Sequence, residues 1–239
     1  MWLALECSGD EASAAVGVPG GVVVEEQVPG PRQHAALLLP AAQRVLHAAG
    51  ARLDDLEAVL ISDGPGSFTG LRIGAAAAKA LVRTRAIPLR TASSLLIMAI
   101  AAGSGERRPV LAVSDALRGE LYYAAYHFGR EHIETLVAPS VGATDDAVAA
   151  FTAGGIVVGS AGEEVLLDLA RRTGAPLLGP PGAAARAAGL IALGAWENGL
   201  STIKDPAAWE PAYGRAAEAQ VRWEAQHGRA LPDSSGQFG

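Results

Sequence analysis

Short blocks of apolar residues alternate with polar turns along the chain, and these blocks predict strands and helices in turn. Three β-type runs open the sequence, at residues 2–6, 12–17 and 22–27. Apolar residues at helical spacing then fill residues 33–49. Pro40 lies inside this segment, so we predict either a kinked helix or a helix that begins near the proline.

The first half of the chain continues with a strand, an alanine-rich helix, a strand and a helix. These elements are expected at residues 58–62, 71–83, 89–91 and 93–102. A second triplet of strands follows at residues 110–115, 121–128 and 133–138, and its first strand ends in Asp115 just as the opening strand ends in Glu6. The matching order predicts an internal duplication, although any chain of alternating strands and helices can contain two similar triplets by chance.

The remaining segments are less regular. Helices are expected at residues 145–151, 163–172 and 183–198, and strands at residues 156–158 and 176–178. The alternation of the two element types predicts the α/β class. The stretch 103–108 is small and charged, as linkers are, so we expect lobes at residues 1–104 and 105–226 and a disordered polar tail at 227–239.

Composition and net charge limit the classes of protein to which the chain can belong. The chain has 239 residues, 50% hydrophobic and 18% charged, so it can bury a core as one large domain or two small ones. Its net charge of −6 disfavours a protein that holds nucleic acid mainly by its own charge. The single cysteine, Cys7, excludes an intrachain disulfide and suits a reducing cytoplasm. No targeting signal is expected, and no membrane span either, because uncharged stretches fall short of about 18–20 apolar residues.

The segment with the most chemical character is the glycine-rich stretch from Ser62 to Gly74. A predicted strand enters it and a predicted helix leaves it, and Ser67 or Thr69 can cap that helix. Backbone amides in such a loop suit a phosphate or a carboxylate. Arg72 is a candidate anion ligand, with an exposed helix arginine as the alternative. The spacing matches neither a Walker A loop nor a Rossmann turn, so a ligand-binding loop and a purely structural turn remain equal alternatives.

Other candidate groups are weaker. Glu6 and Asp115 could form a pair of carboxylates that holds Mg²⁺ through water. We favour the alternative that each caps its own turn, because neither is followed by the glycine and threonine of a phosphate-binding hairpin. Five histidines and one cysteine show no metal-ligand spacing, so no metal site is expected. Cys7 is expected to be a small buried hydrophobe rather than a nucleophile.

The run Gly74-Ala-Ala-Ala-Ala78 gives the second predicted helix a face of small side chains. Such a face lets another helix approach closely. One side of the helix is expected to pack on its own sheet, and a second small, apolar side would suit a partner helix.

Several motifs together resemble the family of the bacterial tRNA threonylcarbamoyladenosine biosynthesis protein TsaB, also called YeaZ. Residues 64–74, GPGSFTGLRIG, resemble the family signature. Further segments agree in order and spacing: LALECS at 3–8, PRQH at 31–34, DALRGELY at 115–122, and EPAY at 210–213 followed by Arg215. The resemblance covers about residues 1–215 and is tight as far as residue 125.

The resemblance implies an actin-like (ASKHA) fold, with two lobes of duplicated strand-strand-strand-helix topology. It implies a non-catalytic scaffold that stabilises the catalytic paralogue TsaD, helps to recruit the ATPase TsaE, and forms a homodimer in isolation. That complex transfers a threonylcarbamoyl group onto the adenosine next to the anticodon of tRNAs that read codons starting with A. The chain would meet tRNA only through the complex, in the cytoplasm and away from membranes. No tightly bound cofactor is implied, although ATP or ADP at the partner interface is compatible with the resemblance.

The resemblance also assigns roles to individual positions. The signature loop, structural or lining an interface nucleotide, comprises Gly64, Pro65, Gly66, Ser67, Phe68, Thr69, Gly70, Arg72 and Gly74. The two N-terminal helices would contact the partner through Arg32, His34, Leu38, Leu39, Val45, Ile73, Ala76, Ala77, Lys79 and Ala80. Glu6 and Asp115 would be degenerate phosphate or metal positions.

Departures from the family pattern bear on catalysis. Glu6 and Cys7 stand where the family usually has Asp and Thr, and Asp63 stands where a basic or small residue is common. These changes weaken any case for nucleotide hydrolysis by this chain. The alternative hypothesis is an independent ATPase or small-molecule kinase of the actin-like fold, which relies on Glu6, Asp115 and the glycine-rich loop. A peptidase, a label attached to relatives, has no zincin motif or catalytic-triad signature to support it.

Overall fold

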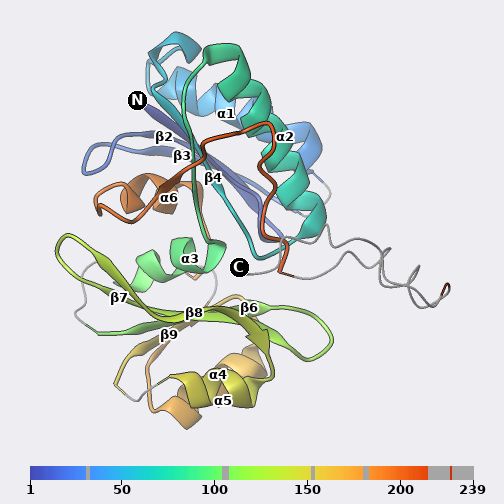
Figure 1. Ribbon diagram of the computed structural model, residues 1–239, viewed down its shortest axis with the longest axis vertical. Helices are drawn as coiled ribbons and strands as arrows, with labels where there is room; N and C mark the ends of the chain where they lie inside the picture. The colour runs from blue at the N-terminus through green and yellow to red at the C-terminus, as the bar shows by residue number, and fades with distance from the viewer. Residues whose placement is uncertain (31–32, 104–107, 152–153, 180–182, 215–226, 228–239) are drawn as a thin grey trace.

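Two mixed β-sheets and the helices that cover them make up the molecule (Figure 1). The computed structural model describes residues 1–30, 33–103, 108–151, 154–179, 183–214 and 227. The predicted Arg32, Arg215, most of the linker and all of the tail except His227 lie outside these residues. The expected division between residues 104 and 105 therefore stays a prediction.

The first half of the chain contains three strands followed by alternating helices and strands. These are β1 (Trp2–Glu6), β2 (Ala12–Gly17), β3 (Val24–Val28), α1 (His34–Ala48), β4 (Ala58–Ser62), α2 (Phe68–Arg85), β5 (Leu89–Ala92) and α3 (Ser94–Gly103). The strands lie in the order β3-β2-β1-β4-β5, with β1 antiparallel to β2 and parallel to β4.

The second half repeats this order of elements. It contains β6 (Val110–Asp115), β7 (Leu121–Phe128), β8 (Ile133–Gly142), α4 (Thr144–Ala150), β9 (Ile156–Gly159), α5 (Glu163–Thr173), β10 (Leu177–Leu178) and α6 (Ala187–Leu193). Its strand order, β8-β7-β6-β9-β10, is that of the first sheet, with β6 antiparallel to β7 and parallel to β9. The predicted internal duplication is confirmed.

The last helix of each half packs on the sheet of the other half. The helix α3 lies against β6, β7 and β9, whereas α6 lies against β1, β2 and β4. The two helices also contact each other between the sheets (Figure 1). A short strand, β11 (Ser201–Thr202), then pairs with β5, so the chain after β10 returns to the first sheet.

Three hydrophobic clusters correspond to this layering. One lies between the sheets and includes Leu95 of α3 and Leu190 of α6, both fully buried. A second lies between the first sheet and the outer helices α1 and α2, and a third lies under α4 and α5. Because the central strands are covered on both faces, β1 and β4 read as continuous apolar runs rather than alternating ones.

Most predicted elements are confirmed, and the differences have local causes. The helix α1 is continuous through Pro40 and begins at His34. The strand β8 runs to Gly142 rather than 138, because it is an edge strand and tolerates Pro139. The helix α6 covers only Ala187–Leu193 rather than 183–198. A short 3₁₀ helix at Leu53–Asp55 and the strand β11 were not expected.

Candidate functional site

The signature loop joins β4 to α2 and is packed tightly against other parts of the chain. A Cβ atom on Gly70 would overlap the backbone carbonyl of Cys7, and one on Gly66 would overlap the carbonyl of Ser8. Gly64 has a φ of +96°, and a Cβ there would overlap the carbonyl of Ala212. These glycines therefore allow close backbone contacts within the protein.

Hydrogen bonds engage the same loop. The amide of Ser67 donates to the carbonyl of Ser8 at 2.7 Å, and the Ser67 hydroxyl caps α2 by accepting from the amide of Gly70 at 3.2 Å. The amide of Ser94, at the start of α3, donates to the carbonyl of Gly64 at 2.7 Å, and the Ser94 hydroxyl donates to the carbonyl of Pro65. Two amides of the loop, those of Ser67 and Gly70, and two carbonyls, those of Gly64 and Pro65, are thus already engaged within the protein. The contacts favour the structural alternative for the loop.

Glu6 is buried directly beneath this loop. It is 1% exposed, and its Oε1 accepts hydrogen bonds from the amide and the hydroxyl of Ser8. Among the residues that the structure describes, the other carboxylate oxygen, Oε2, has no hydrogen-bond partner. Burial raises the pKa of Glu6, and the bonds from Ser8 oppose that rise only in part. A carboxyl group held towards its neutral form is a poor ligand for Mg²⁺.

The raised pKa of Glu6 predicts a stability that falls as pH increases. Protonated Glu6 fits the fold, so its stabilising contribution is complete below the ordinary pKa of 4.5 and is lost as pH rises through the higher pKa of the folded state. We expect Glu6→Gln, which keeps the Oε1 acceptor, to gain stability over the parent chain above pH 4.5, by up to about 1.4 kcal/mol per pH unit. Urea unfolding at several pH values measures the difference. Parallel pH curves for Glu6→Gln and the parent chain would contradict the prediction.

Asp115 occupies a different environment. It is exposed, and its Oδ1 accepts a hydrogen bond from the amide of Leu117 at 2.6 Å, within its own turn. Leu117, Arg118 and Gly119 all have positive φ values in this turn. Glu6 and Asp115 thus each cap their own turn, which is the alternative that the sequence favoured. Among the described residues, no group of three or more His, Cys, Asp or Glu side chains is arranged to hold a metal.

Cys7 lies beside Glu6 in the core. Its side chain is fully buried, and burial raises the pKa of the thiol. A buried neutral thiol is a weak nucleophile. The contact with Gly74, whose Cβ would lie 3.2 Å from the Cys7 sulfur, shows that Cys7 fills space under α2.

The ten positions predicted to contact a partner divide into exposed and buried groups. Leu38, Val45 and Ala77 belong to the core between the helices and the first sheet, and His34 is 1% exposed with its Nε2 3.0 Å from the carbonyl oxygen of Asp10. These four assignments are corrected: the side chains face the protein itself because they lie on the inner stripe of each helix. The remaining described positions are exposed or half-buried: Leu39, Ala76 and Ala80 in the first group, Ile73 and Lys79 in the second.

Arg72 and Lys79 make contacts that sequence reasoning missed. The Arg72 guanidinium lies 4.6 Å from the ring centre of Phe68, whose ring lies 4.7 Å from that of Tyr213. The Lys79 ammonium forms a 3.0 Å ion pair with Glu210. Tyr213 and Glu210 both belong to residues 205–214, which we call the C-terminal strap. The EPAY motif at 210–213 was the available signal, but nothing in the sequence showed that it meets the signature loop.

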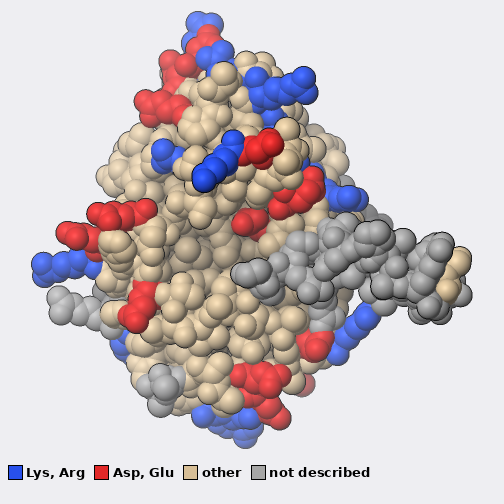
Figure 2. All heavy atoms as spheres, viewed as in Figure 1, with Lys and Arg blue, Asp and Glu red and all other residues tan. Residues whose placement is uncertain are grey.

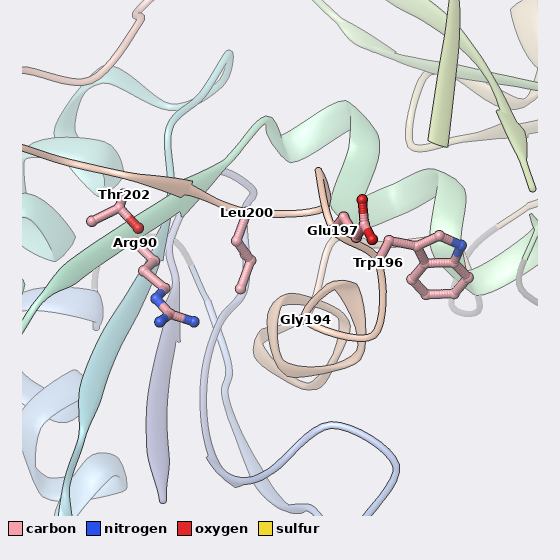
Figure 3. Close-up of a pocket in the computed structure, with 6 residues that line it drawn as sticks. All are labelled: Arg90, Gly194, Trp196, Glu197, Leu200 and Thr202. Carbon is pink, nitrogen blue, oxygen red and sulfur yellow. The ribbon is translucent and has the colours of Figure 1, made fainter. Parts of the chain in front are cut away.

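A cavity of about 320 Å³ lies elsewhere, between β5, β11 and the turn after α6. Its lining consists of Arg90, Gly194, Trp196, Glu197, Leu200 and Thr202 (Figure 3). The Arg90 guanidinium lies 4.9 Å from the ring centre of Trp2, and the Trp196 indole points away from Arg90 and donates to the carbonyl of Gly129. The side chains of Arg90 and Trp196 are therefore both held by contacts within the protein.

Comparisons with known proteins agree with the motifs. The sequence model of the TsaD family, tRNA N6-adenosine threonylcarbamoyltransferase, matches residues 12–173. The tRNA threonylcarbamoyladenosine biosynthesis protein TsaB of Escherichia coli is 37% identical over 126 residues, 52% of this chain and 54% of that protein. TsaB of Bacillus subtilis is 32% identical over 106 residues, 44% of this chain and 46% of that protein. The chain thus matches about half the length of these curated relatives.

Solved structures show the same architecture. A Pseudomonas aeruginosa protein described as similar to the peptidase YeaZ superposes with a TM-score of 0.72 at 24% identity, covering 90% of this chain and 99% of that chain. YeaZ from Pseudomonas aeruginosa superposes with a TM-score of 0.69, also at 24% identity, covering 81% and 89%. With the duplicated sheets described above, these similarities confirm the predicted actin-like fold.

Proposed function

Because the chain belongs to the TsaB (YeaZ) family, we propose that it is the non-catalytic scaffold subunit of the complex that makes threonylcarbamoyladenosine in tRNA. In this proposal it binds and stabilises a TsaD-like catalytic subunit and helps to recruit a TsaE-like ATPase. The complex transfers a threonylcarbamoyl group onto the adenosine next to the anticodon of tRNAs that read codons starting with A. In isolation the chain is proposed to dimerise and to bind no cofactor tightly.

The observation that carries the proposal is the closed signature loop. The carbonyls of Cys7, Ser8 and Ala212 pack directly against its glycines, in the space that a Cβ atom on Gly70, Gly66 or Gly64 would need. Together with a buried Glu6 and a turn-capping Asp115, this packing supports a role in binding a protein rather than in phosphoryl transfer.

The outer face of α1 and α2 supports the second part of the proposal. The exposed residues of the two helices are mostly small or uncharged: Ala35, Ala36, Leu39, Gln43, His47, Ala48, Thr69, Ala76, Ala80 and Thr84, with Arg44, Arg72 and Arg83 as the charged ones. The two helices contact each other, so these residues lie on neighbouring elements. Small side chains let a partner helix come close, and Leu39, 51% exposed, offers an apolar anchor.

Charge supports indirect contact with tRNA. The net charge is −6, and acidic and basic side chains are interspersed on the face shown in Figure 2, with no continuous basic area among the described residues in view. Affinity for nucleic acid depends largely on cationic contacts with phosphates. The partner is therefore proposed to supply most of the tRNA contacts, with ATP or ADP at the partner interface as a further element of the proposal.

None of the described helices is long and apolar enough to cross a membrane, and a cytoplasmic location is part of the proposal.

The partner surface can be tested with two matched leucines. Leu39 on α1 and Leu167 on α5 are 51% and 55% exposed, so a charge at either position should not disturb folding. We expect Leu39→Glu to weaken binding to the TsaD-like subunit at least tenfold and to lower threonylcarbamoyladenosine formation by the reconstituted proteins, because the carboxylate would have to be desolvated at the interface. Leu167→Glu should behave like the parent chain. Equal binding by both variants would reject this surface, and equal product formation when the chain is omitted would reject the scaffold role.

The alternative, an independent ATPase or small-molecule kinase, is tested on the chain alone. It predicts ATP turnover that Asp115→Ala abolishes. The scaffold proposal predicts no turnover by the parent chain or by the variant.

A further inference from the structure

The C-terminal strap runs along α2 towards its N-terminal end (Figure 1). Near the middle of α2, the Lys79 ammonium pairs with Glu210 at 3.0 Å and lies 5.9 Å from the ring centre of Trp209. Lys79 also donates to the carbonyl of Ala207 at 3.4 Å. One lysine therefore fixes three successive parts of the strap to the helix.

Further along, the strap meets the signature loop. The amide of Ala212 donates to the carbonyl of Asp63 at 2.7 Å, and the Ala212 carbonyl fills the space that the absent side chain of Gly64 leaves. The buried ring of Tyr213 packs on Phe68 in the first turn of α2, and its hydroxyl donates to Glu210 at 3.1 Å. The strap thus holds both the loop and the start of the helix.

The same residues reach the second sheet. The hydroxyl of Tyr122, at the start of β7, donates to the carbonyl of Tyr213 at 3.3 Å. A Cβ on Gly214 would lie 2.6 Å from the Tyr122 ring and 3.0 Å from Pro65 of the signature loop. Residues 213 and 214 therefore lie between the loop of the first lobe and a strand of the second.

We propose that residues 209–214 are an internal lock, which occupies the junction between the two lobes beside the signature loop and fixes their relative position. In this proposal the signature glycines and the EPAY motif pack against each other and form one structural unit. A chain locked in this way presents α1 and α2 on a rigid base. It has no need of a bound nucleotide to hold its lobes together. This proposal does not depend on the identity of the partner.

Amide hydrogen exchange of the full-length chain tests the lock. Tyr213→Ala removes the ring from Phe68, and Tyr122→Phe removes only the hydrogen bond that joins the lobes. We expect Tyr213→Ala to accelerate exchange at least fivefold in two separate segments, residues 63–72 and 119–126. We expect Tyr122→Phe to accelerate exchange at least twofold in 119–126 and in the strap. MgATP should change none of these rates in the parent chain.

A matched control separates the lock from general destabilisation. Leu169→Ala creates a cavity in the cluster under α5, where Leu169 is fully buried, and this cluster includes none of the described strap residues. It should lower the melting temperature without selectively exposing 63–72. The lock is rejected if Tyr213→Ala accelerates exchange only within the strap, if its pattern equals that of Leu169→Ala, or if MgATP slows exchange at the junction in the parent chain.

Discussion

Gly70→Ala is expected to destabilise the chain by at least about 3 kcal/mol and to prevent folding at 37 °C. Gly70 lies in the first turns of α2, where helix propensity alone would favour alanine by about 1 kcal/mol. The added Cβ, however, would overlap the backbone carbonyl of Cys7, which directly follows the buried end of β1 and cannot turn aside as a flexible side chain could. The close approach of helix to strand therefore outweighs the propensity. Far-UV circular dichroism with urea unfolding measures the effect.

Gly179→Ala is the matched control for this substitution. A Cβ at Gly179 meets no atom of the described residues within 4 Å, and the φ of Gly179 lies outside the left-handed region. The same chemical change there should shift the unfolding free energy by less than about 0.5 kcal/mol. A Gly70→Ala protein with near-parent stability would show that α2 and β1 can separate, and the structural account of the signature would then be wrong.

Leu190→Ala is expected to cost about 2–5 kcal/mol and to destabilise both lobes together. Leu190 is fully buried in α6, a helix that follows the second sheet in sequence but packs on the first. It belongs to the cluster that also contains α3 and residues of both sheets. A cavity at this position therefore weakens contacts that neither lobe makes by itself.

Coincident unfolding transitions would support this expectation. Tryptophan fluorescence reports on Trp2 and Trp209 beside the first sheet and on Trp196 beside Phe128 of the second, whereas far-UV circular dichroism reports on the backbone of the whole chain. Both signals should move to a lower urea concentration in Leu190→Ala and should remain superimposed. Two separate transitions would mean that the lobes unfold independently.

Sequence reasoning captured the fold where periodicity was strong. The strands Trp2–Glu6, Ala58–Ser62 and Val110–Asp115 agree with their predicted bounds, because long apolar runs between turn residues have few alternatives. The helix α2 starts three residues earlier than predicted, because Phe68 packs on the strap rather than on the sheet and so lies off the apolar stripe. The predicted final helix was too long because Gly194, which is the C-cap of Ala187–Leu193, was placed inside the helix instead of at its end.

The candidate site was harder to predict, because it depends on contacts between distant segments. Both the glycine-rich signature and the EPAY motif are visible in the sequence, but their meeting at Ala212 and Gly64 is a property of the folded chain. Similarly, Leu38 and Leu39 are adjacent and chemically identical, and only the packing of α1 decides that one is buried and the other exposed. The burial of Glu6 could not be foreseen either, since an acid at the end of a strand is usually near solvent.

The crossed positions of α3 and α6 bear on how such a chain could have arisen. In a single β-β-β-α-β-α-β-α repeat, the last helix would not pack on the sheet of that repeat. One face of the sheet would therefore be left uncovered. Two identical repeats could solve both problems by exchanging these helices in a symmetric pair. The present chain has the arrangement of such an ancestral dimer, joined from the end of α3 to the start of β6. Once joined, the two copies no longer had to be alike, so one could keep long outer helices while the other shortened its own.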